Sequence, residues 1–278
     1  MLSGRRLREK QELFATLHKV MAAMKAMAFA EMNRLQQQLG PETQCLQRYQ
    51  QAMLALQEGR RLPTGSDAAR KTVKNTEVVI GTERGFCGEI NRRLSEHIQQ
   101  QKAKTAERDY FIVGDRLQQL LDDGSFTGVT GAQSAEGIET VIDDLFARWL
   151  AQNQLPSLSS LQITYWDDMR HEITTLTALS QILPSNESTA ADDFAPVCYT
   201  SKQELLRDLE PDLMFVLLHY ATKMALLSEN RQRMAHLDAA TRHLKDKNEA
   251  LQLQANQLRQ SGIISEVEAL LSVQDGLA

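Results

Sequence analysis

The chain has 278 residues, of which 42% are hydrophobic and only 5% are aromatic. This length allows one ordinary domain plus extended helices, and so few aromatic residues suit helical packing better than a large β-sandwich. The net charge is -5, and no aromatic residues are interleaved with the basic ones, which argues against nucleic-acid binding. Three cysteines without metal-ligand spacing argue against a disulfide framework and indicate a reducing compartment.

The charge is unevenly distributed along the chain. Residues 1–39 hold seven Lys/Arg and three Asp/Glu, whereas residues 75–200 hold nine and nineteen. A basic helix on an acidic protein is either a solvated face or a surface for an acidic protein partner. The arginines after Met1 resemble a transit peptide, but Glu9 and Glu12 interrupt that pattern, so we interpret this segment as mature protein. No window approaches the twenty apolar residues of a membrane span, so we expect no transmembrane segment.

Residues 1–59 are predicted to form the N-terminal coiled-coil helix. Apolar residues recur in steps of four and three, which is the spacing of a coiled-coil seam. The predicted seam comprises Leu13, Leu17, Val20, Met24 and Met27. Gly40-Pro41 predicts a kink or short break near residues 40–41. Residues 60–74, which contain Pro63 and Gly65, are predicted to be a linker.

Residues 75–200 are predicted to form a central α/β domain. Short apolar runs alternate with helical patterns, which is typical of a parallel sheet. The expected strands are Glu77–Thr82, Tyr110–Val113, Leu161–Trp166 and, at an edge or in a hairpin, Ile173–Leu183; the expected helices are Asn91–Ala103, Arg116–Leu121 and Ala135–Leu150.

Residues 201–278 are predicted to form the C-terminal coiled-coil helix. Fifty residues between Pro211 and Gly262 contain neither glycine nor proline, and a helix of that length spans about 75 Å. Leu237, Leu244, Leu251 and Leu258 fill one core position of the predicted seam, and Met234, Thr241, Asn248, Ala255 and Gly262 fill the other. These weaker core residues favour pairing within the chain, or inside a surrounding partner, over a stable homodimer.

The predicted fold class is therefore α/β plus a long antiparallel coiled coil. The terminal helices form a rod, and the central parallel-sheet domain forms a head.

No catalytic signature emerges from the sequence. The Gly81–Gly88 segment lies between a strand and a helix, as a phosphate-binding loop would, but it lacks the Lys-Ser/Thr pair and the dinucleotide glycine spacing. A tight turn is the better interpretation. Cys87 has no base placed beside it, His236 and His243 are two turns apart, and the acidic pairs are adjacent in sequence, so we expect no catalytic, cofactor or metal site.

Three separated motifs resemble one family, the gamma subunit of F-type rotary ATP synthases. They are His18–Met24, the Gly81–Gly88 turn with Asn91, and the stretch from Leu227-Ser228-Glu229 through Arg233-Met234 to Asn256, Arg259, Gln260, Ile263 and Glu266. Their order and spacing are similar to the family pattern over nearly the whole chain. This resemblance implies a rotor stalk without an active site of its own.

In that family the terminal helices lie inside a ring of alternating alpha and beta subunits, and the α/β domain stands on the c ring beside epsilon. Ion flow turns the ring and the stalk, and the asymmetric stalk drives the catalytic beta subunits through their nucleotide states. The resemblance implies these partners, no cofactor, and a peripheral location at the cytoplasmic face of the bacterial plasma membrane. It also implies contacts with beta subunits at Lys19, Met24, Lys25, Arg84, Cys87, Asn256, Arg259, Gln260 and Glu266.

Several positions depart from the family pattern. Glu31 stands where the family has lysine, Glu83 replaces aspartate and Phe86 replaces leucine. These departures indicate a divergent branch, an alternative bacterial form that pumps sodium or protons.

Two other functions are compatible with the residues alone. One is a ligand-binding or enzymatic α/β domain with helical dimerisation arms, which predicts a tight homodimer. The other is a coiled-coil adaptor without a motor role.

Overall fold

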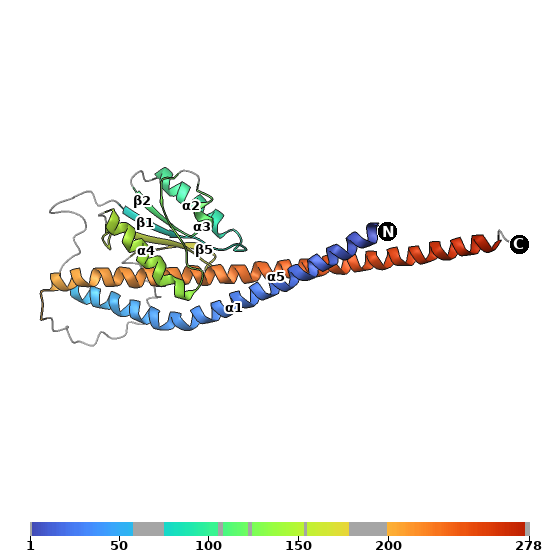
Figure 1. Ribbon diagram of the computed structural model, residues 1–278. Coiled ribbons are helices and arrows are strands. Elements are labelled where there is room, and N and C mark those ends of the chain that lie inside the picture. The colour runs from blue at the N-terminus through green and yellow to red at the C-terminus, as the bar shows by residue number, and fades with distance from the viewer. Residues whose placement is uncertain are drawn as a thin grey trace. The chain divides into compact units, whose positions relative to one another are not determined.

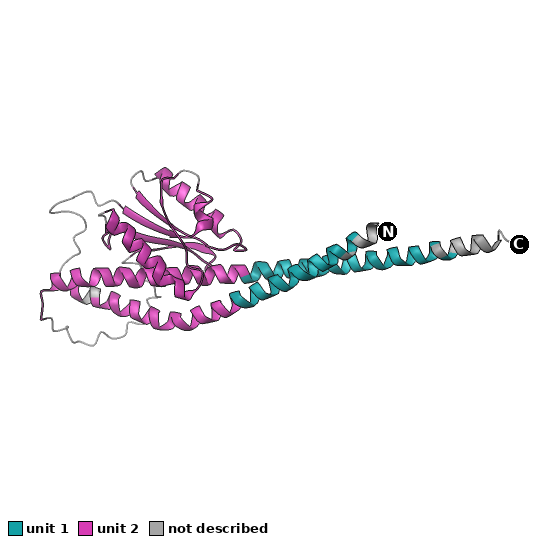
Figure 2. Ribbon diagram, viewed as in Figure 1, with its two compact units in different colours: residues 1–28, 234–278 teal, residues 29–233 magenta. Residues whose placement is uncertain are grey.

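The computed structural model describes residues 2–57, 75–104, 108–121, 124–152, 155–177 and 199–275. Two long helices, α1 (Leu2–Gln57) and α5 (Lys202–Asp275), precede and follow an α/β domain (Figure 1). The chain divides into two compact units, residues 1–28 with 234–278 (unit 1) and Phe29–Arg233 (unit 2) (Figure 2). The predicted linker at 60–74 lies outside the described residues.

Unit 2 contains a five-stranded sheet in the order β3-β2-β1-β4-β5. Its strands are β1 (Asn75–Ile80), β2 (Arg108–Val113), β3 (Thr127–Val129), β4 (Leu161–Asp167) and β5 (Glu172–Thr177). The first four are parallel, and β5 runs antiparallel to β4. The predicted α/β domain with a mainly parallel sheet is confirmed, and β3 is an additional strand that the sequence analysis missed.

Helices cover both faces of this sheet (Figure 1). Val79 of β1 and Ile112 of β2 face α2 (Ile90–Lys104) and α3 (Asp115–Gln118), and they form one core with them. Val78 and Phe111, one residue earlier, face the opposite way because side chains alternate along a strand. They join the core formed with α4 (Ile138–Ala151), which follows the short 3-10 helix η1 (Ala135–Gly137), and with both long helices.

Within unit 2, α1 and α5 pack along each other. Leu35 and Leu46 of α1 belong to the same buried cluster as Leu213 and Leu217 of α5. Glu42 of α1 contacts His219 and Lys223 of α5. Tyr49, later in α1, lies near Asp212, earlier in α5, because burial and then the charge of Asp212 raise the pKa of Tyr49. Since later residues of α1 meet earlier residues of α5, the two segments are antiparallel.

Neither long helix is interrupted at its proline. α1 continues through Gly40 and Pro41, and α5 continues through Pro211. A proline inside a helix removes one backbone hydrogen bond and is destabilising. Around Pro41 the buried Leu35 and Leu46 anchor the helix on both sides, so the short break that the sequence analysis allowed for does not occur.

Unit 1 consists of the remaining parts of the two helices, which wind around each other in an antiparallel pair (Figure 2). Leu237 of α5 is fully buried in it. An ion pair joins Lys25 of α1 to Asp238 of α5. The predicted pairing of the two chain ends within one molecule is therefore confirmed.

Part of α1, Glu9–Ala52, is long and apolar enough to cross a membrane by length and composition alone. The sequence analysis expected no such stretch. However, Lys19 and Lys25 lie within it, and a lysine at the centre of a bilayer costs about 2.5–3.5 kcal/mol. Lys25 also pairs with Asp238 of α5, so this part of the helix lies against another helix of the same chain.

Candidate functional site

Unit 1 exposes a row of apolar residues on α1. Leu13, Leu17, Val20 and Met27 are 55%, 40%, 50% and 64% exposed. Their spacing of four, three and seven residues places them on one face of the helix. This row, which we call the α1 stripe, holds four of the five residues of the predicted seam, and the assignment of these four to the contact with α5 is wrong; the fifth, Met24, is half-buried.

The residues of α1 that pack on α5 lie about one position after the residues of the α1 stripe. Ala28 is buried, and Phe14, Met21, Met24 and Lys25 are half-buried. The N-terminal segment therefore carries two apolar rows. Periodicity detects both rows but does not indicate which one meets α5.

The predicted seam on α5 agrees better with the structure. Leu237 is fully buried, Met234, Leu244 and Leu251 are half-buried, and Leu258 is 45% exposed. Burial therefore declines toward the C-terminal end of the helix.

The last turns of α5 expose a second apolar surface. It comprises Leu253, Leu258, Ile263, Ile264 and Val267, each at least 45% exposed. The predicted contact residues Asn256, Arg259 and Gln260 are exposed in the same region, and Arg259 donates a hydrogen bond of 2.6 Å to Asn256 Oδ1. The side chain of Glu266 lies outside the description.

Two of the predicted contact residues on α1 are partly engaged within unit 1. Lys19 is exposed, whereas Met24 is half-buried and Lys25 pairs with Asp238. Lys25 and Arg242 hydrogen-bond to Asp238, and these bonds lower the pKa of its carboxyl group.

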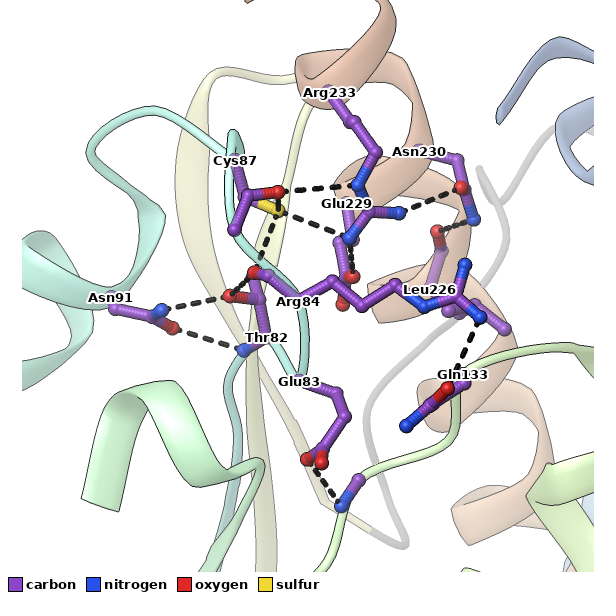
Figure 3. A network of polar contacts seen from close by, with 12 residues as sticks. Thr82, Glu83, Arg84, Cys87, Asn91, Gln133, Leu226, Glu229, Asn230 and Arg233 are labelled. Carbon is purple, nitrogen blue, oxygen red and sulfur yellow. Dashed lines mark hydrogen bonds and ion pairs between the residues drawn. The ribbon is translucent and has the colours of Figure 1, made fainter. Parts of the chain in front are cut away.

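In unit 2, the Gly81–Gly88 turn connects β1 to α2 (Figure 3). Asn91 holds the start of the turn, because its Oδ1 accepts a 2.9 Å hydrogen bond from the Thr82 backbone and its Nδ2 donates one of 2.7 Å to Thr82 Oγ1. These contacts fix the start of the turn from within.

The other end of the turn is attached to α5 (Figure 3). Arg233 donates through Nε to the Gly85 carbonyl at 3.2 Å, and its Nη2 lies 3.4 Å from Cys87 Sγ. Arg233 also pairs with Glu229, one helical turn earlier, and both side chains are only 4% exposed. Burial raises the pKa of Glu229, against the lowering effect of Arg233. A buried charge requires such partners because desolvation is unfavourable.

Cys87 is part of this attachment and is not a contact surface. Its side chain is 5% exposed, and the thiol lies 3.2 Å from the carbonyls of Arg84 and Gly85. Burial, followed by the charge of Glu229, raises the pKa of Cys87 to about 12. The expectation that its side chain faces a partner is therefore wrong.

A loop after β3 connects the turn to α1. Glu83 accepts backbone hydrogen bonds from Asp115 at 3.0 Å and Gly131 at 2.9 Å, and Arg84 donates to Gln133 at 3.2 Å. A few residues later, Glu31 of α1 accepts a 2.6 Å hydrogen bond from the Ala135 backbone at the start of η1.

This last contact accounts for the departure at position 31. A carboxylate is favourable at a helix N-terminus, where a lysine is not. The neighbouring Arg34 forms an ion pair with Glu136. Hydrogen bonds with Ser134, with its own backbone and with Arg34 lower the pKa of Glu136 to about 2.

Among the described residues, no group of three His, Cys, Asp or Glu side chains is placed to hold a metal ion. The polar network around the turn consists of satisfied hydrogen bonds and ion pairs, and it serves to attach one element to another. Sequence reasoning missed the roles of Glu31 and of the Glu229–Arg233 pair, although the four-residue spacing of Glu229 and Arg233 is a recognisable helical ion-pair signal.

These features define a class of protein in which two long terminal helices pair and an α/β domain is inserted between them. The model of the ATP synthase family matches residues 3–274. The chain belongs to this family, among its gamma chains.

Curated relatives and solved structures agree with this assignment. The gamma chain of Anaeromyxobacter sp. strain Fw109-5 is 24% identical over the full length of both chains. That of Mycoplasmoides gallisepticum is 21% identical, with 98% of this chain and 99% of the relative covered. The rotor of the Euglena gracilis mitochondrial ATP synthase gives a TM-score of 0.61 at 16% identity, covering 94% of this chain and 99% of that one. A chain in the OSCP/F1/c-ring part of the same synthase gives 0.59 at 15% identity, covering 99% and 94%. At these identities the solved structures show the shared fold.

Proposed function

We propose that this chain is the central rotor subunit of an F-type ATP synthase, turned by an ion-driven c ring at the cytoplasmic face of a bacterial plasma membrane. The paired ends of α1 and α5 rotate inside a hexamer of alpha and beta subunits, and the α/β domain stands on the c ring beside epsilon. The beta subunits carry out catalysis, and this chain biases their nucleotide states through contacts that change as it turns.

The observation that carries this proposal is the α1 stripe. Large apolar side chains in a continuous row on the outside of a helix pair indicate a protein surface that covers them. Lys19 stands beside the stripe and is exposed, so acidic loops of the surrounding subunits fit the same surface. Arg84, Asn256, Arg259, Gln260 and Glu266 remain proposed contacts, whereas Met24 and Lys25 are partly occupied by the contact with α5.

The α1 stripe would also suit a second copy of the chain, which is the homodimer alternative. Sedimentation of the isolated chain distinguishes the two: the rotor subunit is monomeric or aggregates without partners, whereas dimerisation arms give a stable dimer.

The direct test replaces Leu13, Leu17 and Val20 together by glutamine, which keeps helix propensity. Because the three side chains are exposed, the isolated variant should retain its helical content and unfolding temperature. Reconstituted with the alpha and beta subunits, it should assemble poorly or lose coupled ATP turnover. Leu150→Gln, at a residue of α4 that is 65% exposed, is the matched control and should behave as wild type. Full assembly and coupling by the triple variant would refute the proposal.

A further inference from the structure

Phe86 has a backbone conformation that a bulky residue rarely adopts. Its φ is 64°, in the left-handed region, yet its side chain is 53% exposed. A strained residue in the middle of a turn needs surrounding contacts to hold it, and such residues concentrate at functional positions. Because more than half of the side chain faces solvent, burial of the ring accounts for little of this strain.

The contacts that hold Phe86 act on its two neighbours. Arg233 binds the Gly85 carbonyl before it and lies against Cys87 after it, and the Cys87 thiol reaches back to the carbonyls of Arg84 and Gly85. Arg233 is itself fixed by Glu229 and, at 3.0 Å, by Asn230 Oδ1. We call Glu229 and Arg233 the latch.

We infer that Phe86 is a contact residue for a partner protein, and that the latch is a positioning device that presents its ring. The inference rests on the proposed function, and it replaces Cys87 by Phe86 as the residue of this turn that meets the catalytic subunits. The latch ties the turn to α5, so the presented ring moves with that helix.

The charges around Phe86 define the chemistry of the partner surface. Arg84, Arg92 and Arg93 lie on the turn and the first turn of α2, against Glu83 and Glu89. Arg92 pairs with both Glu89 and Glu96, Arg93 also lies against Glu89, and Glu83 accepts hydrogen bonds from two backbone N–H groups. Arg84, two residues before Phe86, donates to the neutral Gln133 and so supplies the positive charge beside the ring. The occupant is therefore an acidic segment that also offers an apolar pocket for the ring.

The ring is tested by Phe86→Gly, which removes the side chain and relieves the backbone strain. The isolated variant should be at least as stable as wild type, because glycine adopts a positive φ without strain. In the complex reconstituted with alpha and beta subunits, coupled ATP turnover should fall about fivefold or more. Phe86→Leu keeps an apolar side chain and should stay within about twofold of wild type.

The latch is tested by the double variant Glu229→Leu/Arg233→Met, in a chain whose Cys45 and Cys198 are replaced by serine. Replacing a buried ion pair by apolar residues is often neutral for stability, so the helix should persist while the turn is released. Alkylation of Cys87 should become about tenfold faster or more, because an exposed thiol ionises more readily and the thiolate is the form that reacts. Arg242→Met removes an exposed pair of the same four-residue spacing and should leave the alkylation rate unchanged.

A double-mutant cycle separates positioning from mere structural support. If the latch acts through Phe86, adding Phe86→Gly to the double variant should cause no further loss of coupling. Additive losses, or unchanged coupling by Phe86→Gly in an assembled complex, would overturn the inference and leave the proposed function standing. Failure of the wild-type chain to assemble with the partner subunits would overturn both.

Discussion

Lys223 of α5 forms an ion pair with Oε1 of Glu42 on α1, and the same oxygen lies 3.1 Å from His219 Nδ1. The Lys223 side chain is 6% exposed and that of Glu42 is 22% exposed. Glu42 directly follows Pro41, where α1 lacks a backbone donor. This charged group therefore holds the two helices together where α1 is intrinsically weakest.

Lys223→Met should destabilise unit 2, because it leaves the Glu42 carboxylate with His219 alone. We expect a loss of about 2 kcal/mol in the free energy of unfolding, below the roughly 3–5 kcal/mol of a fully buried pair, since Glu42 is partly exposed. Lys245→Met, on the same helix, removes a pair whose side chains are 70% and 64% exposed, and it should have no measurable effect. Urea unfolding followed by circular dichroism measures the stability of both variants. Equal losses in the free energy of unfolding would show that the buried pair stabilises the fold no more than the exposed pair does.

The same group predicts a dependence of stability on pH. Burial raises the pKa of Glu42, but hydrogen bonds and charges of His219 and Lys223 outweigh it, so the pKa lies below the ordinary value of 4.5. A carboxyl group with a lowered pKa in the folded state stabilises it fully above the ordinary value, and this contribution is lost as the pH falls through the lowered value. The difference in unfolding temperature between wild type and Glu42→Gln should therefore shrink as the pH falls below 4.5. A constant difference across that range would contradict the assignment.

Local patterns were sufficient to predict the main elements. β1 and β2 end in the apolar runs Val78–Ile80 and Tyr110–Val113, and β4 is largely apolar; burial on both faces of the sheet is what such runs predict. β3 was missed because it has only three residues, one of them Gly128, which is too short for a period to appear. Its pairing with β2 depends on a neighbouring strand that no local pattern specifies.

The candidate site was harder to predict, because its contacts join residues far apart in the sequence. Arg233 and Cys87 are 146 positions apart, and Glu31 and Ala135 are 104 positions apart. The family resemblance drew attention to the Gly81–Gly88 turn, but only the packing against α5 showed that Cys87 points inward and Phe86 outward. Similarly, the choice between the two apolar rows of α1 depends on the helix that packs against it.

Glu31→Lys introduces the residue that the family resemblance leads us to expect at this position, and it should destabilise the start of η1 and α4. The lysine cannot accept the hydrogen bond from the Ala135 backbone, and it places a second positive charge beside Arg34. Loss of such a capping contact costs about 1 kcal/mol. Glu31→Gln keeps an acceptor oxygen and should recover most of the loss. Hydrogen exchange of the Ala135 amide reports the effect directly, and equal protection in wild type and Glu31→Lys would show that the contact does not cap the helix.

Gly114→Ala should disturb the turn from the side of β2. Gly114 has a φ of +103°, and a Cβ there would lie 2.9 Å from the Thr82 carbonyl oxygen. Strain of this kind costs about 1–3 kcal/mol, and the close contact adds to it. Gly137→Ala is the control, since Gly137 has a φ of -78° and its nearest neighbour is 3.7 Å from an added Cβ. Unfolding measurements should separate the two variants, and faster alkylation of Cys87 in Gly114→Ala alone should report displacement of the turn.

Deletion of residues 257–278 should separate helix pairing from coupling. The deletion keeps Leu237, Leu244 and Leu251, which are buried or half-buried, but removes the exposed Leu258, Ile263 and Ile264. The truncated chain should therefore retain its paired helices, as judged by helical content and unfolding temperature, while its coupled ATP turnover in the reconstituted complex falls. Deletion of residues 276–278 is the control and should leave coupling intact. Unchanged coupling in the longer truncation would favour an adaptor, because an adaptor does not need the exposed end of α5 to act on its partners.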